Sequence, residues 1–324
     1  MTLLAAPPPT PTPSRRQRRL RWRMPKLPLL IALVAGVGVA VLLFPTAAAW
    51  VMQYQQSQLI DEYSAEVREL SPDNRAEAIR EASAYNATLV GGATVGANER
   101  IPLALDEADA AAIDYSALLA ADSDGLMARV KIPAIDADLP IYHGTSEDVL
   151  QKGVGHLQGT SLPVGGRDTH SILTAHRGLA TAELFTNLDR VRVGDTFTIE
   201  VFGEVLTYQV RETQVVEPDQ TETLYPQLGN DLVTLVTCTP LGINSHRILV
   251  TGERILPTPL ADLDAAGARP DVPGFPWWLA GIGVTLVVLA VYVYVSGRPR
   301  RPAARPEALD GPTTPLRLRK GSEG

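Results

Sequence analysis

The sequence predicts a mainly β protein, a closed barrel or sandwich with short connecting helices, preceded by a helical hairpin and flanked by two transmembrane helices. Two uncharged apolar stretches near the ends of the chain predict the transmembrane helices. From residue 128 onward, short runs of β-branched and aromatic residues alternate with Gly, Pro and Asp, which predicts many short strands. The strand patterns do not alternate with helix patterns, so the sequence does not predict a parallel α/β sheet.

The two apolar stretches, residues 27–44 and 277–295, contain no charged residue. At about 1.5 Å per residue, each helix is near the length that crosses a hydrocarbon core of roughly 30 Å. The first stretch could instead be a cleaved signal peptide. However, it is longer than the roughly 7–15 apolar residues of such a peptide, and only the weak cleavage-like sequence PTAAAW follows it. We therefore expect two membrane helices.

Basic residues flank both stretches. Residues 1–26 hold 7 basic and no acidic residues, and residues 296–324 hold 7 basic and 3 acidic residues. Because Lys and Arg accumulate on the cytoplasmic side, we expect both termini, which look disordered, in the cytoplasm. Of the 29 basic and 36 acidic residues in the chain, 15 and 33 then remain in residues 45–276, a net charge of −18. This acidic extracytoplasmic region argues against nucleic acid as a partner.

The elements between the membrane stretches follow in order. Residues 46–70 and 75–89 have apolar residues at helical spacing, with SPDN as a break between them, and predict the helical hairpin. The glycine-containing segment GGATVGANERIP that follows reads as a loop and does not fit a dinucleotide fingerprint. Seven strand-like runs then cover residues 128–135, 138–144, 170–176, 195–203, 204–217, 231–239 and 246–254. Gly203-Glu204 predicts a hairpin turn, and residues 145–153 and 180–191 predict short helices in the connections.

The chain contains a single cysteine, Cys238, so an intramolecular disulfide is impossible. A lone thiol is either an inert buried residue or a reactive one. Cys238 ends the strand-like run DLVTLVTC and is followed by Thr-Pro and the loop LGINS. A strand end beside a loop is a position at which a rigid scaffold presents functional groups. A reactive thiol there requires a cationic neighbour or a proton acceptor.

Two residues could supply those groups. Of the five histidines, His143, His156, His170, His176 and His246, only His176 ends a strand-like run and opens a turn in the way that Cys238 does. Arg247 begins the strand after the cysteine loop, so an antiparallel return would bring its guanidinium beside the thiol. Such a fixed cation could stabilise a tetrahedral oxyanion. Taken singly, the histidine is more often structural and the arginine more often a surface residue.

Two long segments resemble the sortases, membrane-anchored transpeptidases of Gram-positive bacteria. TLVTCTPLGINSHRILVTGER, residues 234–254, is similar to their cysteine-to-arginine signature. LPIYHGTSEDVLQKGVGHLQGTSLPVGGRDTHSILTAHRGL, residues 139–179, is similar to their histidine-bearing half. The resemblance covers roughly residues 128–255 and is strongest to the pilin-polymerising class C, which the second membrane helix with its basic tail also fits.

The resemblance implies an eight-stranded sortase-type β-barrel and three catalytic residues. Cys238 would be the nucleophile that forms an acyl-thioester, His176 the general acid and base, and Arg247 the ligand of the oxyanion and substrate. The substrate would be an LPXTG-like sorting signal and the acceptor an amine, a pilin lysine in pilus assembly or a cell-wall precursor. No cofactor and no metal are implied. No aspartate can be assigned as a third member of a triad.

Three other readings stay open. The chain could be a housekeeping sortase that anchors proteins to the cell wall, or a cysteine hydrolase or protease that uses the same residues. It could also be a membrane-tethered scaffold with an unreactive thiol. Two departures from the family pattern matter: residues 101–124 lack the Asp-Pro-aromatic lid signature, and Leu241 stands where an aromatic residue is common. We expect a weakly gated site in which an acid within residues 106–109 (Asp106, Glu107 and Asp109) pairs with Arg247.

These observations divide the chain into seven parts. The expected boundaries are 1–26 basic cytoplasmic tail, 27–44 transmembrane helix, 45–127 membrane-proximal helical and lid-like region, 128–256 catalytic barrel, 257–276 linker, 277–295 transmembrane helix and 296–324 basic cytoplasmic tail.

Overall fold

The computed structural model of the chain describes residues 22–89, 94–95, 102–103, 114–121, 125–220, 222–270 and 273–298. Residues 40–282 form one compact unit that contains the barrel, and the segments on either side form a second unit.

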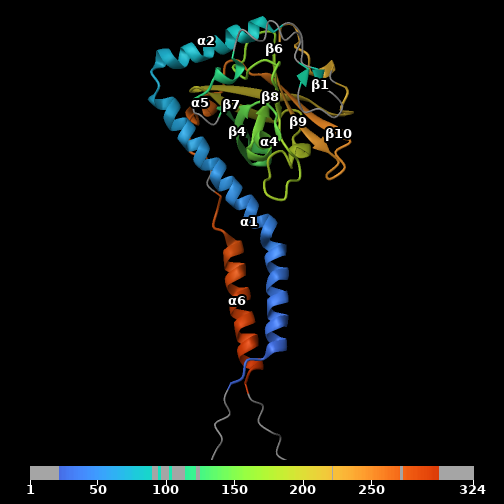
Figure 1. The fold of residues 1–324 in the computed structure, drawn as a ribbon. Helices are drawn as coiled ribbons and strands as arrows, with labels where there is room; N and C mark the ends of the chain where they lie inside the picture. The colour runs from blue at the N-terminus through green and yellow to red at the C-terminus, as the bar shows by residue number, and fades with distance from the viewer. Residues whose placement is uncertain are drawn as a thin grey trace, which may run out of the picture. The chain divides into compact units, whose positions relative to one another are not determined.

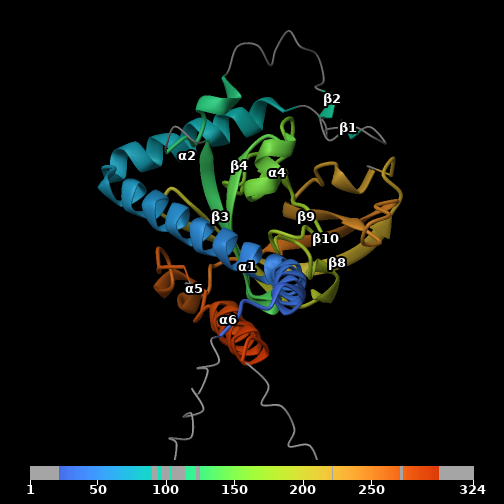
Figure 2. The ribbon, with the colours of Figure 1, turned by 60° about the horizontal axis from the view of Figure 1, so that its bottom comes forward.

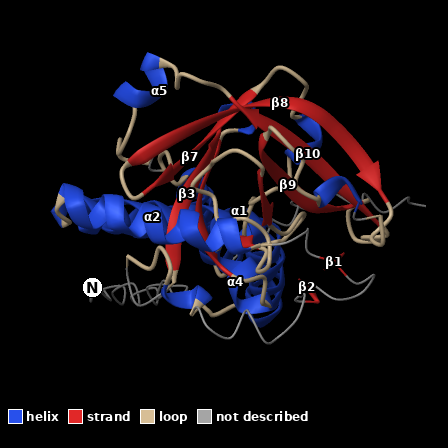
Figure 3. Cartoon of the chain, turned by 90° about the horizontal axis from the view of Figure 1, so that it is seen from above, coloured by secondary structure: helices blue, strands red, loops and turns tan. Residues whose placement is uncertain are grey.

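Eight strands close into a barrel in the order β10-β8-β7-β3-β4-β5-β6-β9, which Figure 1 and Figure 3 show from the side and from above. They are β3 (Leu126–Ile132), β4 (Ala137–His143), β5 (Val154–His156), β6 (Thr169–Thr174), β7 (Thr196–Val201), β8 (Glu204–Val216), β9 (Asp231–Thr239) and β10 (His246–Arg254). The pairs β4–β5 and β6–β9 are parallel, and the other pairs are antiparallel. The predicted eight-stranded barrel is therefore confirmed, and a two-sheet sandwich is excluded.

Alternation along the strands separates an inner from an outer face of the barrel. Leu173 of β6, Val233 and Leu235 of β9, and Ile248 and Val250 of β10 are buried in the main core. The residues between them point to the other side of the sheet. The outer face of β6, β9 and β10 therefore carries Ile172, Val236 and Leu249.

The β7–β8 hairpin turns one residue earlier than the sequence indicated. Val201 pairs with Glu204, so Phe202 and Gly203 form the turn, rather than Gly203 and Glu204. Both have positive φ, +46° and +85°, as a two-residue type I′ turn requires. Phe202 adopts this unusual conformation because its ring is buried against Tyr63, with ring centroids 6.4 Å apart. Tertiary packing thus outweighs the local preference for glycine.

The remaining differences concern short elements. Strand β5 was not predicted, because three residues are too short to show alternation. Helix α4 (Glu147–Lys152) was predicted, but residues 180–191 contain only the 3₁₀ turn η3 (Leu188–Arg190) among other turns. In the segment expected as a loop, the described residues form the two-stranded ladder of β1 (Thr94–Val95) and β2 (Pro102–Leu103). The other 3₁₀ turns are η1 (Tyr115–Ala117), η2 (Pro133–Ile135) and η4 (Glu222–Leu224).

The predicted helical hairpin is present as α1 (Lys26–Glu69) and α2 (Pro72–Thr88). The break between them is a capping signal: the Ser71 hydroxyl accepts a hydrogen bond from the Asn74 amide at 3.1 Å, and proline takes the first position of α2. Tyr63 and Val67 of α1 pack with Leu126 and Tyr142. Figure 2 shows α2 beside β3, on the side of the barrel away from β9 and β10.

Two helices, α1 and α6 (Trp277–Ser296), are long and apolar enough to cross a membrane. Both contain a predicted apolar stretch, although α1 continues beyond its stretch through Pro45 into the membrane-proximal part. The indole Nε1 of Trp50 on α1 donates a hydrogen bond to the Gly274 carbonyl at 2.8 Å, just before α6 begins.

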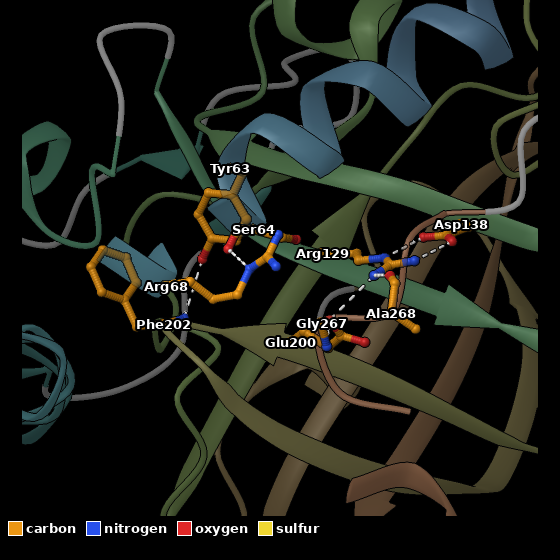
Figure 4. Close-up of polar contacts among 9 residues, drawn as sticks. All are labelled: Tyr63, Ser64, Arg68, Arg129, Asp138, Glu200, Phe202, Gly267 and Ala268. Atoms are coloured by element: carbon orange, nitrogen blue, oxygen red, sulfur yellow. Dashed lines mark hydrogen bonds and ion pairs between the residues drawn. The ribbon is translucent and has the colours of Figure 1, made fainter. Parts of the chain in front are cut away.

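A buried arginine attaches the chain after α5 (Leu260–Asp264) to the barrel (Figure 4). The Arg129 guanidinium donates two 2.6 Å hydrogen bonds to Asp138, and Nη1 donates to Glu200 at 3.3 Å and to the Ala268 carbonyl at 2.8 Å. Glu200 also accepts the Gly267 amide at 3.2 Å. Because the Arg129 side chain is only 1% exposed, these hydrogen-bonded acceptors must compensate its buried positive charge. Figure 4 also shows the hydroxyl of Tyr63 on α1, which accepts a hydrogen bond from the Phe202 amide at 3.2 Å.

Candidate active site

The three residues predicted to act together lie at equivalent positions in three adjacent segments: Cys238 on β9, Arg247 on β10 and His176 two residues beyond the end of β6. Strands β6 and β9 run parallel, with Thr174 opposite Val236, so His176 and Cys238 each lie two residues further along. Strand β10 returns antiparallel, and Arg247 is the direct register partner of Cys238. The topology therefore places His176, Cys238 and Arg247 in one row across the end of the sheet, with the cysteine in the middle.

All three residues line one pocket on the outer face of the barrel. Thr174 and Val236, two residues before His176 and Cys238, also line it, and the connection between β8 and β9 contributes Glu217, Pro218 and further residues. Of the five histidines, all within the described chain, only His176 lines this pocket. The sequence-based choice of His176 over the other four is thus consistent with its location.

The deeper part of the pocket is apolar. Leu157, Ile172, Leu224 and Leu249 form a small buried cluster separate from the main core, with Val216 and Val236 packed against it. All six residues also line the pocket. An extended peptide in this pocket would bury apolar side chains close to the thiol, since such surfaces contribute about 25 cal/mol per Å² when they are removed from water.

Cys238 is a free thiol of intermediate exposure. A buried and inaccessible cysteine, as the scaffold reading requires, is therefore not observed. Arg247 beside it is held by its own loop: its Nη1 donates to the carbonyls of Asn244 at 3.0 Å and His246 at 3.1 Å. Within the described residues, no carboxylate forms an ion pair with Arg247. Its charge is thus available to an anionic group in the pocket.

A residue that sequence reasoning missed contacts the histidine ring. Glu147, in the first turn of α4, has its Oε1 3.0 Å from Nε2 of His176. The His176 side chain is 12% exposed and that of Glu147 is 49% exposed. The two lie 29 residues apart, and the antiparallel pairing of the intervening strands β5 and β6, which the sequence does not reveal, brings them together. A carboxylate at this distance fixes the ring and favours its protonated form.

Two other histidines are buried parts of the fold. His156 contacts the Tyr115 hydroxyl at 2.7 Å and the Ser161 carbonyl at 2.9 Å, and burial lowers the pKa of His156 to about 4. His170 contacts the Tyr225 carbonyl at 3.1 Å and the Thr234 hydroxyl at 2.7 Å, and burial lowers the pKa of His170 to about 4. Neither is a proton carrier near neutral pH.

The remaining two histidines bind local partners. The ring nitrogens of His143 lie 2.9 Å from the Gly125 carbonyl and 2.6 Å from the Leu118 carbonyl. Nδ1 of His246 lies 2.8 Å from the Ser245 hydroxyl. Like the two buried histidines, both lie outside the pocket lining, so His176 is the one candidate acid and base beside Cys238.

The two departures from the family pattern have different outcomes. Leu241 is 53% exposed, and its side chain packs over Gly178 in the turn after His176, so it covers the rim of the site rather than the pocket floor. Asp106, Glu107 and Asp109 lie outside the described residues. Near the end of the lid-like region, Tyr115 is buried within η1 and contacts His156, and it is not part of the pocket lining.

In the described parts of the chain, no group of three or more His, Cys, Asp or Glu side chains is arranged to hold a metal ion. The row of a thiol, an imidazole and a guanidinium is by itself a set of groups suited to acyl transfer: a nucleophile, a proton carrier and an oxyanion ligand.

Comparison with known proteins gives consistent matches. The sortase domain family matches residues 130–255. Sortase C of Streptococcus pneumoniae is 43% identical with a TM-score of 0.55, and the match covers 63% of this chain and 100% of that one. Sortase C1 of Streptococcus agalactiae is 40% identical with a TM-score of 0.57, covering 62% and 100%. Sortase D of Bacillus subtilis is 30% identical over 129 residues, 39% of this chain and 62% of that protein, which is under two thirds of its length.

The fold and these matches define the class of protein as a sortase-type β-barrel. The chain belongs to the sortase family, whose members are cysteine transpeptidases that act on peptide bonds. Its structural neighbours include class C sortases, the pilin sortases, of streptococci and Actinomyces, at about 40–46% identity. The family assigned from the two sequence segments is thus confirmed.

Proposed function

We propose that the chain is a membrane-anchored cysteine transpeptidase that cleaves an LPXTG-like sorting signal and joins it to an amine. One observation carries the proposal: His176, just beyond the end of β6, lies in one row with Cys238 on β9 and Arg247 on β10, and all three line the same pocket. Because the chain has no other cysteine, Cys238 cannot form an intramolecular disulfide. It lies between His176, a proton carrier, and the fixed cation Arg247.

The first half-reaction forms a thioester. The Cys238 thiolate attacks the carbonyl carbon of the threonine in the sorting signal, and the carbonyl electrons move to oxygen. Arg247 binds the resulting oxyanion, which is the charge that develops in the transition state. When the oxyanion collapses, the carbon–nitrogen bond breaks and protonated His176 donates its proton to the leaving amine. The peptide that follows the threonine departs, and the acyl group remains on sulfur.

The second half-reaction reverses these roles. An amine attacks the thioester carbonyl, His176 accepts the proton that the amine loses, and the carbon–sulfur bond breaks to release the thiolate. His176 must therefore be protonated in one step and neutral in the next. Glu147 keeps the ring in one orientation throughout and stabilises its protonated form, as the carboxylate partner of a catalytic histidine does in other acyl-transfer sites.

The apolar part of the pocket supports the type of donor. Ile172, Val236 and Leu249 lie on the same outer face as Cys238, so apolar side chains upstream of the threonine have a surface to bury. An LPXTG-like signal carries leucine and proline at those positions. The pocket is bounded by the β8–β9 connection at Glu217 and Pro218, which therefore contacts the signal peptide.

For the acceptor, a lysine of a pilin subunit is the substrate best supported. The support is the similarity to class C sortases, among them a Streptococcus pneumoniae enzyme whose structure concerns pilin substrate specificity. A cell-wall amine, as a housekeeping sortase uses, is the second candidate. It is favoured by the matches to sortase A proteins, which are 25% identical to this chain. Water as acceptor would make the chain a hydrolase with the same residues.

We also propose the two-pass arrangement indicated by the charges. Residues 27–44 and 277–295 cross the membrane, and the basic tails 1–26 and 296–324 lie in the cytoplasm. The region 45–127, the catalytic barrel 128–256 and the linker 257–276 lie outside. Because Cys238 is the one cysteine of the chain, a membrane-impermeant thiol reagent tests this topology directly. Labelling of intact cells expressing the protein supports it, and labelling only after lysis contradicts it.

The proposed reaction is tested with the full-length protein in detergent, an LPXTG-type peptide and a lysine-containing pilin domain. Mass analysis should find the pilin lysine joined to the threonine carboxyl group, with release of the glycine-containing peptide. The acid alone, formed even at high amine concentration, would make the chain a hydrolase. Absence of cleavage would reject the enzymatic function.

A further inference from the structure

The residue after the histidine is an arginine whose three donor groups are all engaged. Nε of Arg177 donates to the Thr186 carbonyl at 3.0 Å, Nη1 donates to the Thr239 hydroxyl at 2.8 Å, and Nη2 lies 2.9 Å from the Asp189 carboxylate. The side chain is only 9% exposed. The mechanism proposed above leaves this residue without a role.

Two of these partners lie in the turn-rich segment that follows the histidine. The His176 carbonyl accepts the Phe185 amide at 3.2 Å, and the Thr186 hydroxyl accepts the Gly178 amide at 3.0 Å. Phe185 is fully buried in the core. Arg177 contacts Thr186 and Asp189 of the same segment. Residues 176–189, which include the histidine, are therefore held together by hydrogen bonds and by the buried Phe185 ring.

The third partner lies on the other strand. Thr239 is the residue after Cys238, so the guanidinium of Arg177 joins the residue after the proposed acid and base to the residue after the proposed nucleophile. The paired part of β6 and β9 ends at Thr174 and Val236, with Ala175 still donating to the Val236 carbonyl at 3.1 Å. The side chain of Arg177 continues the connection beyond the point at which the ladder ends.

From this geometry we infer that Arg177 is a positioning residue, which sets the separation of His176 and Cys238 and is not itself in contact with substrate. The inference rests on the proposed function. It is a geometric role rather than an electrostatic one, because the Asp189 carboxylate compensates the charge of the guanidinium. The planar guanidinium group donates to three acceptors in different directions at once, and the compact ammonium group of a lysine cannot do this.

The test compares full-length variants in detergent. Arg177→Met should lower kcat for acylation on the order of 10²-fold, since a misplacement near 1 Å can have that effect, with KM nearly unchanged. Arg177→Lys should recover only part of the loss. Arg190→Met, in the same segment at an exposed position, makes the same chemical change away from the pocket and should retain wild-type kcat.

A second readout separates positioning from folding and from the proposed function. The pH dependence of Cys238 alkylation by a small thiol reagent reports the coupling of thiol and imidazole, and needs no sorting-signal substrate. Its midpoint should move in Arg177→Met and stay in Arg190→Met. Asp189→Asn keeps an oxygen acceptor for Nη2 and removes only a charge, so it should move the midpoint by much less than Arg177→Met does. A midpoint that shifts as far in Asp189→Asn as in Arg177→Met would overturn the inference in favour of an electrostatic role.

Thr239→Val keeps Arg177 and removes only its acceptor beside the thiol. This variant tests the same role of Arg177 if Arg177→Met does not fold. The single variants and the double variant should be non-additive, with the second change adding little to the first. Full activity and an unchanged alkylation profile in both Arg177→Met and Thr239→Val would refute the inference. A wild-type protein without transpeptidation would instead reject the proposed function, while the alkylation profile would still decide the role of Arg177.

Discussion

Acidification should destabilise the barrel through two buried histidines that have no part in the proposed chemistry. In the neutral ring of His156, Nε2–H donates to the Ser161 carbonyl and Nδ1 accepts the Tyr115 hydroxyl. In His170 the neutral ring donates to the Tyr225 carbonyl and accepts the Thr234 hydroxyl. Burial disfavours the charged form of each ring and lowers both pKa values from 6.5 to about 4.

The sign of the effect follows from proton linkage. Between pH 6.5 and 4 the unfolded chain binds protons at these two rings and the folded chain does not, so stability falls as the pH falls. From pH 7.5 to pH 5, each histidine lowers the free energy of unfolding by about 2 kcal/mol, and the pair by about 4 kcal/mol. Asp231, whose pKa burial raises, acts in the opposite direction, because its folded carboxyl group binds a proton more readily.

Urea unfolding of residues 46–276, followed by the β-sheet circular dichroism signal at both pH values, measures this loss. At a slope of about 2 kcal/mol/M, the midpoint should fall by roughly 2 M between pH 7.5 and pH 5. His170→Gln should be less stable at pH 7.5 and lose about half of the pH dependence, whereas His246→Gln should retain all of it. Equal midpoints for the wild type at the two pH values would show that the rings are protonated in the folded state.

Three further predictions concern side chains at the site and at the linker. Arg247→Lys should lower the acylation rate on the order of 10²–10³-fold, because a point charge does not replace a planar oxyanion ligand; near-normal turnover would reduce Arg247 to an electrostatic neighbour. Glu147→Gln should move the basic limb of the kcat/KM profile to lower pH, because acylation requires protonated His176 and the ring loses the carboxylate that favours this form; an unchanged profile would contradict that role. Arg129→Met should lower the free energy of unfolding by about 3–5 kcal/mol, measured by urea titration, because Asp138 and Glu200 would lose their buried partner; a change below about 1 kcal/mol would argue against it.

The parts of the fold that could be predicted from sequence are those with a local signal. Strands β7 to β10 alternate clearly, and the apolar stretches within α1 and α6 are uncharged. Strand β5 has only three residues, and the closure of the barrel depends on the parallel pairs β4–β5 and β6–β9, which leave no mark on local composition. The position of the β7–β8 turn was missed by one residue because the burial of Phe202 against Tyr63 is a tertiary effect.

In the candidate site, too, some residues have a local sequence signal and others are brought together only by strand pairing. Cys238, His176 and Arg247 could be selected because each stands at the end or start of a strand-like run, which is visible in the sequence. Glu147 and Arg177 carry no such signal. A glutamate in the first turn of a short helix and an arginine in a turn are ordinary surface residues by sequence. The pairing of β5 with β6 places His176 beside Glu147, and the pairing of β6 with β9 places Thr239 beside Arg177.

The central claim is that Cys238 becomes covalently acylated by a sorting signal. Full-length protein is incubated with an LPXTG-type peptide without any added amine, quenched in acid, digested and analysed by mass spectrometry. The account predicts that the peptide containing Cys238 gains the mass of the sorting signal up to its threonine, that hydroxylamine removes this mass, and that Cys238→Ala shows none. Cleavage of the signal by the Cys238→Ala variant, or an adduct on another residue, would contradict the account.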